Sequence, residues 1–254
     1  MNTTQSIQMA VIKRVVILAN SIKNSGRCLA GKELRRTRGG WEQGGWIRIV
    51  GTEDGGEVPV SWMLEQLGRE PRLLDIIDIP LEGMVPLPDQ PENWLMVRRA
   101  PWREKGMMPQ EDAPRLLDFP LKLWGTQKRS VDAGYVDTMG EPASLYLIQP
   151  EVVEPIRVWT EDSLDPSGGH FDRHCRRITI RYRRSFHEFT VTDPVLQAEY
   201  YPDLPRRGDP VLTVPISLGG PIYMSVSLTP PWHGKQYKIA AGFIRLKSDA
   251  AASP

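Results

Sequence analysis

A short stretch near the N-terminus has the residue spacing of a phosphate-binding loop. Gly26 and Gly31 are separated by four residues and followed by Lys32, and an apolar run at 15–19 precedes them. In a working loop of this type the lysine is followed by a Ser or Thr that binds magnesium, but this chain has Glu33. A carboxylate there would repel phosphate, so we interpret the stretch as a glycine-containing loop between strands.

A second stretch gathers possible metal ligands, because His170, Asp172, His174 and Cys175 lie close together in the sequence. A zinc site usually needs four ligands, or three and a water molecule, and no second cluster is evident to complete the set. The neighbouring arginines would also disfavour a bound cation. We expect a polar loop at 170–175 without a metal, and the residue types alone leave metal binding open.

Catalytic motifs are absent from the sequence. Cys28 and a distant histidine could act as nucleophile and base, but two cysteines and four histidines make such pairings easy by chance. We find no serine-hydrolase elbow, no zinc-protease motif and no dinucleotide-binding motif after a strand. We therefore predict that the protein is not an enzyme and uses no cofactor. A magnesium-dependent phosphohydrolase using Lys32 is the lowest-ranked alternative.

A row of arginines at 177–183 is the strongest remaining signal. In a strand, Ile178, Ile180 and Tyr182 would enter a core, and the arginines at odd positions would share the outer face. Each guanidinium group can donate two hydrogen bonds to a phosphate, and we expect no acidic neighbour on that face. An ordinary solvated sheet face is the competing interpretation. The candidates for nucleic-acid binding in this row are Arg177, Arg181 and Arg183.

A second basic region combines cations with glycines and tryptophans. Proteins that bind single-stranded nucleic acid use cations along the backbone and aromatic rings that stack on bases. Trp41, in a glycine-rich stretch, is expected to be exposed, and Trp46 is expected in the core. The candidates in this region are Lys23, Arg27, Lys32, Arg35, Arg36, Arg38 and Trp41. A weaker third set consists of Trp124, Gly125, Lys128 and Arg129.

Short strands would position these residues. The 23 prolines and 22 glycines leave little room for long helices, and one short helix is predicted at 61–67, before Gly68. About five strands in each half suit a five-stranded OB-type barrel, while a β-sandwich remains possible. We predict a mainly β fold of two tandem OB-like small β-barrels with few short helices, with domains at 11–105 and 106–248.

Composition limits the partners and the compartment. The net charge is only +1, so affinity for phosphate must come from a local patch. The two cysteines lie far apart, as is typical of free thiols in a reducing compartment. No run approaches the roughly 18 apolar residues that cross a bilayer, and the N-terminus lacks the features of a secretion signal. We expect a cytoplasmic protein with no membrane partner.

Several motifs resemble those of bacterial dual-OB-domain proteins. The matching segments are 14–23, 26–33, 46–48, 90–95, 123–125, 227–228 and 237–241. The resemblance implies two OB modules, and the family's frequent company with bacterial conflict systems implies nucleic-acid or nucleotide sensing. It also implies that members of the family share polar contacts at the positions of Arg27 and Lys32, and that a Glu at position 33 is expected in the family. The chain departs from the family at Ile49, where proline is common, and at 170–184.

These observations predict a non-enzymatic recognition module for nucleic acid or nucleotide within a bacterial defence or mobile-element system. The sequence does not separate DNA from RNA or from a small nucleotide. The alternative is a scaffold that docks a partner protein, because OB barrels offer exposed strand edges and because Trp and Arg are frequent at interface hot spots.

Overall fold

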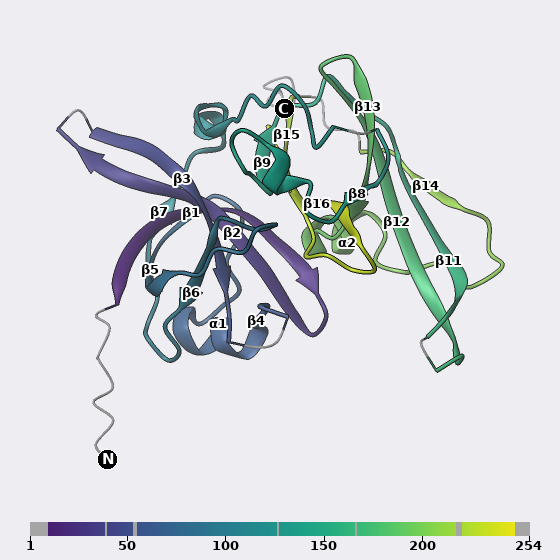
Figure 1. Cartoon of the computed structure of the whole chain (residues 1–254), viewed down its shortest axis with the longest axis horizontal. Helices are drawn as coiled ribbons and strands as arrows, with labels where there is room; N and C mark the ends of the chain where they lie inside the picture. The colour runs from purple at the N-terminus through teal and green to yellow at the C-terminus, as the bar shows by residue number, and fades with distance from the viewer. Residues whose placement is uncertain are drawn as a thin grey trace, which may run out of the picture. The chain divides into compact units, whose positions relative to one another are not determined.

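The computed structural model shows a chain built mainly from strands. It describes residues 10–38, 40–52, 55–125, 127–165, 167–216 and 220–246. The chain forms two compact units (Figure 1). Unit 1 comprises the residues up to Leu87 together with Pro91–Pro109, and unit 2 comprises Pro88–Gln90 and the residues from Gln110 onward. No helix in the described ranges is long and apolar enough to cross a membrane.

Unit 1 is a closed barrel. Its elements within the described residues are β1 (Val11–Lys23), β2 (Gly26–Thr37), β3 (Gly40–Val50), β4 (Val58–Pro59), α1 (Val60–Leu67), β5 (Asp75–Met84), β6 (Asn93–Met96) and β7 (Arg103–Met107). The barrel strands pair in the order β1-β2-β3-β6-β5, and an antiparallel ladder between β1 and β5 closes the ring. Strands β3 and β6 run parallel, while the other barrel neighbours run antiparallel.

The barrel core comes from alternate residues of these strands. It includes Val15, Ile17, Leu29, Ile47, Ile49, Ile77, Ile79 and Leu81. Helix α1 adds Met63 to this core and ends at Gly68, whose left-handed backbone (φ 80°) lets its N–H donate to the carbonyl of Leu64. The predicted helix and its glycine terminus are confirmed.

Two glycines let β2 lie close to its neighbours. A Cβ atom on Gly31 would lie 2.0 Å from the backbone oxygen of Val16, and one on Gly26 would lie 2.7 Å from that of Val58. The glycine spacing that resembles a phosphate-binding loop is therefore required by packing against β1 and β4. The predicted loop at 26–32 is wrong, because these residues belong to β2.

Unit 2 is a larger sheet wrapped around its own core. Its elements within the described residues are two 3-10 helices (Gln110–Leu116 and Val136–Thr138), β8 (Ser130–Asp132), β9 (Leu145–Ile148), β10 (Val152–Val153), β11 (Ile156–Leu164), β12 (His170–Tyr182), β13 (Ser185–Val191), α2 (Pro194–Tyr200), β14 (Leu212–Val214), β15 (Ile222–Leu228) and β16 (Lys235–Arg245).

The strand order of unit 1 recurs in unit 2. Strands β11, β12 and β13 form an antiparallel meander, β13 pairs in parallel with β16, and β16 pairs antiparallel with β15. A helix, α2, again lies between the third strand and the fourth. Within the described residues no ladder joins β11 to β15; β14 pairs with β11, and β9 with β15. The prediction of a mainly β fold with two OB-like modules and few short helices is confirmed.

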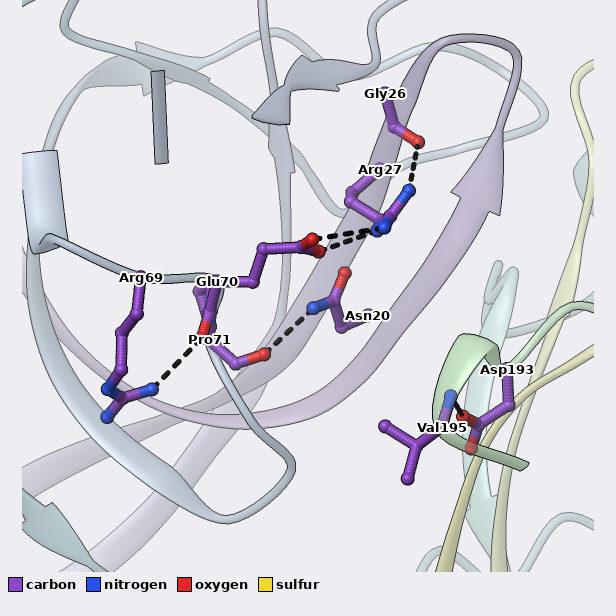
Figure 2. A network of polar contacts seen from close by, with 8 residues as sticks. All are labelled: Asn20, Gly26, Arg27, Arg69, Glu70, Pro71, Asp193 and Val195. Atoms are coloured by element: carbon purple, nitrogen blue, oxygen red, sulfur yellow. Dashed lines mark hydrogen bonds and ion pairs between the residues drawn. The ribbon is translucent and has the colours of Figure 1, made fainter. Parts of the chain in front are cut away.

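Asp193 connects helix α2 to the sheet of unit 2. One carboxylate oxygen accepts hydrogen bonds from the N–H groups of Val195 (2.8 Å, Figure 2) and Leu196 (3.1 Å). The other accepts from the N–H of Phe243 on β16 at 3.1 Å. Burial raises the pKa of Asp193, and these three donors act in the opposite direction. A single carboxylate thus satisfies three backbone donors and fixes the helix against the sheet.

We predict that Gly31→Ala destabilises the protein strongly. The added methyl group would overlap the Val16 carbonyl, and overpacking of this kind costs about 1–3 kcal/mol or more. Urea unfolding measures the loss. Gly45→Ala on β3 is the matched control, because a Cβ there would meet no atom within 4 Å. Equal stability of the two variants would contradict the prediction.

We also predict that Asp193→Ala lowers the free energy of unfolding by about 2–4 kcal/mol, because it removes a helix cap and leaves buried N–H donors without an acceptor. Asp165→Ala is the control, since Asp165 accepts from the N–H groups of Ser167 and Gly169 at an exposed site where water can replace it. Thermal unfolding compares them, and a larger loss for the Asp165 variant would count against this role for Asp193.

Candidate nucleic-acid interface

The β2–β3 hairpin extends beyond the barrel of unit 1 (Figure 1), and it carries Trp41 on β3. Trp41 is 52% exposed. Arg36 is its direct partner in the ladder, so the two side chains project from the same face of the hairpin. Arg14 of β1 lies over the ring, with its Cζ 4.7 Å from the ring centroid. The result is an exposed aromatic surface bordered by guanidinium groups.

Arg14 is fixed in this position by Asp78 on β5. Its Nε and Nη2 atoms donate to the two carboxylate oxygens at 2.6 and 2.9 Å. These hydrogen bonds lower the pKa of Asp78 despite its partial burial. No local sequence pattern points to Arg14, because it is the pairing of β1 with both β2 and β5 that brings it to Trp41.

The other hairpin cations divide into paired and unpaired groups. Glu33 accepts from Lys13 at 2.8 Å and from Arg35 at 2.7 Å. Burial opposes ionisation of Glu33, but these two donors outweigh it and lower the pKa. Arg36 and Arg38 are exposed, and neither forms an ion pair with any residue that the structure describes. They carry the uncompensated charge of the hairpin.

Arg27 and Lys23 hold parts of unit 1 together. The Nε and Nη2 atoms of Arg27 donate to the Glu70 carboxylate at 2.7 and 3.1 Å (Figure 2). Lys23 donates to the carbonyl of Gly55. The charge of Arg27 is therefore compensated by an acid 43 residues away in sequence, which no local pattern could reveal.

Lys32 is buried in the structure, with 3% of its surface exposed. Its Nζ lies 3.4 Å from Oε1 of Gln43 and 5.6 Å from the ring centroid of Trp46, its ladder partner. Trp46 is half-buried on this outer face and does not belong to the barrel core. Its predicted core position is wrong.

The predicted arginine row of unit 2 forms only in part. Ile178, Ile180 and Tyr182 enter the core as predicted. Arg177 and Arg181 share the opposite face, as strand alternation requires, but Arg177 is only 6% exposed. It donates to Thr190 on β13 at 2.9 Å.

Two features of the row differ from the prediction. Acids do lie beside it, with Glu188 3.8 Å from Arg177 and Glu151 3.0 Å from Arg181, because neighbouring segments supply them. Arg183 does not belong to the row, since β12 ends one residue earlier and Arg183 has a left-handed backbone (φ 47°) in the turn to β13.

The third candidate set is divided between core and surface. Trp124 is fully buried and donates from its indole nitrogen to the carbonyl of Ala143 at 2.9 Å, so it offers no stacking surface. Lys128 is exposed, and Arg129 is partly buried with its Cζ 5.2 Å from the ring centroid of Tyr237.

The histidines at 170 and 174 lie on β12, so the predicted polar loop is wrong. His170 contacts Asp162 at 2.7 Å, and His174 contacts the Thr160 hydroxyl at 2.6 Å. Among the residues that the structure describes, no group of three or more His, Cys, Asp or Glu side chains could hold a metal ion.

The sequence matches the model of a protein family described as dual OB-containing domain over residues 13–243. It matches no curated protein. A solved replication protein A heterotrimer bound to single-stranded DNA is similar over 99% of this chain and 52% of its own chain, at 9% identity and a TM-score of 0.37. This chain thus spans about half the length of that one.

Two further solved structures have weaker similarity. The tetrameric p202 HIN2 structure is 9% identical, with 94% of each chain covered and a TM-score of 0.29. A deletion mutant of the single-stranded DNA binding protein from Thermus aquaticus is 9% identical, with 97% of this chain and 99% of the other covered and a TM-score of 0.20. The assignment of a family therefore rests on the sequence match alone.

We predict that Cys28 reacts slowly in the folded protein. Burial raises the pKa of its thiol, and the charges of Lys23 and Arg48 offset this only in part. Because the thiolate is the reactive form, alkylation of Cys28 by iodoacetamide at pH 8, followed by mass spectrometry, should be slower than in the urea-unfolded chain. Faster reaction in the folded protein would restore the nucleophile hypothesis.

Proposed function

The chain belongs to the dual OB-containing family, and we propose that it recognises nucleic acid through the β2–β3 hairpin of unit 1. OB barrels bind oligonucleotides on the face of their second and third strands and on adjacent loops. In unit 1 these strands are β2 and β3, and their hairpin carries the exposed Trp41.

One observation carries this proposal: Trp41 is exposed between Arg14, which lies over its ring, and Arg36, its ladder partner. A base stacked on an aromatic side chain contributes about 1–3 kcal/mol whatever its identity. Arg14, paired with Asp78, lies over one face of the ring, so the base would stack on the other face. Arg36, which has no ion pair among the described residues, would meet a phosphate that flanks the base. The ion pair with Asp78 holds Arg14 in place, so little side-chain entropy is lost on binding.

The proposed contacts are Arg36, Arg38 and Trp41, with Arg35 beside them. Arg27 and Lys32 are given a structural role, because the first is paired with Glu70 and the second is buried. The hairpin is the place in unit 1 where cations without an acid partner among the described residues adjoin an exposed aromatic ring.

We propose recognition without turnover. In a phosphate-binding loop, backbone N–H groups point at the ligand. Here the corresponding backbone of β2 pairs with β1 and β3, and Glu33 is engaged with Lys13 and Arg35.

We predict that Trp41→Ala weakens binding roughly 5- to 150-fold, the equivalent of one stacked base. Arg36→Gln should weaken binding and reduce the slope of log K against log salt by about one, because one phosphate contact is lost. Fluorescence anisotropy with labelled single- and double-stranded DNA and RNA at two salt concentrations measures both effects.

Two controls accompany these variants. Leu64→Ala removes an exposed apolar side chain of α1, and Arg115→Gln removes a cation that is paired with Asp112. Both should bind like the unchanged protein. The proposal fails if the unchanged protein binds none of the four nucleic acids at micromolar concentration, or if the controls lose as much affinity as the hairpin variants.

A further inference from the structure

A second exposed tryptophan lies in unit 2, in the turn between β15 and β16. Trp232 is 61% exposed. Its N–H donates to the carbonyl of Lys235 at 2.8 Å, and its own carbonyl accepts from the Lys235 N–H at 3.1 Å. His233 and Gly234 between them have left-handed backbones, with φ 48° and 71°, as in a tight two-residue hairpin turn. The turn therefore holds Trp232 in place although the side chain is exposed.

Aromatic and guanidinium groups continue from this turn along β16. The Trp232 ring centroid lies 4.2 Å from that of His233 and 6.2 Å from that of Tyr237. Arg129 lies over the Tyr237 ring at 5.2 Å. Its carbonyl accepts a hydrogen bond from the N–H of Lys238 at 2.8 Å, so its backbone is fixed to the same strand.

Strand register places a buried arginine in the sheet beside this surface. Arg177 on β12 pairs with Thr190 on β13, which pairs with Ile239 on β16. The guanidinium group of Arg177 lies 5.8 Å from the ring centroid of Trp159 on β11. Burial and the nearby charge of Arg129 lower the pKa of Arg177. Like charges are thus held close together on this face, and a bound anion would relieve their repulsion.

Carboxylates compensate only part of this charge. Glu188 lies 3.2 Å from Arg157 and 3.8 Å from Arg177, so one acid serves two arginines. Arg129 has no ion pair with any residue in the described part of the chain. Its charge is therefore available beside the aromatic rings of the turn.

We infer that Trp232, Tyr237 and Arg129 form a second nucleic-acid site, the unit-2 track, that stacks unpaired bases on the rings and binds a phosphate through Arg129. The ligand class rests on the proposed function, but the residues are separate from the unit 1 hairpin. Bases in a duplex are stacked on one another, so only single-stranded nucleic acid presents faces to such rings. The inference thus specifies single strands as the ligand of unit 2.

The test uses the full chain and a labelled oligothymidylate, with fluorescence anisotropy as the readout. Trp232→Ala should weaken binding roughly 5- to 150-fold, and Trp232→Phe should restore most of it, because phenylalanine still stacks. Arg129→Gln should weaken binding and reduce the salt slope by about one. Binding to a labelled duplex of the same length should be unchanged by Trp232→Ala.

Phe119→Ala is the matched control, because Phe119 is an aromatic residue of unit 2 with 73% exposure. Its carbonyl accepts a hydrogen bond from Arg183 in the turn between β12 and β13, and not from a residue of the unit-2 track. This variant should bind oligothymidylate like the unchanged protein. Competition with thymidine monophosphate separates a free nucleotide from a polymer as the ligand. If the monophosphate displaces the oligothymidylate at low concentration, the unit-2 track binds a single nucleotide. If it does not, the unit-2 track binds a polymer.

The outcomes separate this inference from the proposed function. If Trp232→Ala binds like the unchanged protein while Trp41→Ala does not, the unit-2 track is refuted and the unit 1 hairpin stands. If both variants lose affinity and Phe119→Ala does not, both sites are supported. If the unchanged protein binds no oligonucleotide, both proposals fail.

Discussion

Each unit depends on one short parallel ladder. In unit 1 it pairs residues 48–50 of β3 with 93–95 of β6, and in unit 2 it pairs 190–191 of β13 with 239–240 of β16. Parallel neighbours cannot be joined by a tight turn, so the chain must cross over between them. In both units a short helix and two strands occupy the crossover, β4 and β5 in unit 1 and β14 and β15 in unit 2. In unit 1 the second and third strands pair with each other directly as a hairpin.

Many of the charged side chains in this protein form ion pairs with one another. With 32 basic and 31 acidic residues, ligand affinity depends on which cations the fold leaves without an acid. Pairs such as Arg14–Asp78 and Arg27–Glu70 join segments far apart in sequence. Such partly exposed pairs contribute little stability, but they set the positions of the groups that remain unpaired. The exposed arginines of the β2–β3 hairpin matter for this reason.

Much of the fold follows from local patterns, while the site does not. The alternation at 177–183 correctly placed Ile178, Ile180 and Tyr182 in a core, and Gly68 correctly marked a helix end, because both depend on periods of a few residues. Lys32, in contrast, is buried, and Arg177 has an acid from β13 beside it. Side-chain exposure and ion pairing depend on which residues of the neighbouring strands lie opposite, and the sequence of one segment does not reveal those residues. Glycine-rich stretches were interpreted as loops, whereas Gly31 is required by the close approach of two strands.

Closure of the unit 1 barrel has a consequence for how the protein is made. The closing ladder joins residues 11–16 to 76–81, so β1 keeps an unpaired edge until β5 has been synthesised. The residues at 15–18 are fully buried in the finished barrel. Pairings between distant segments form slowly, and an open apolar strand edge promotes association between chains. The newly made β1–β2 hairpin is therefore open to association between chains until β5 has been added.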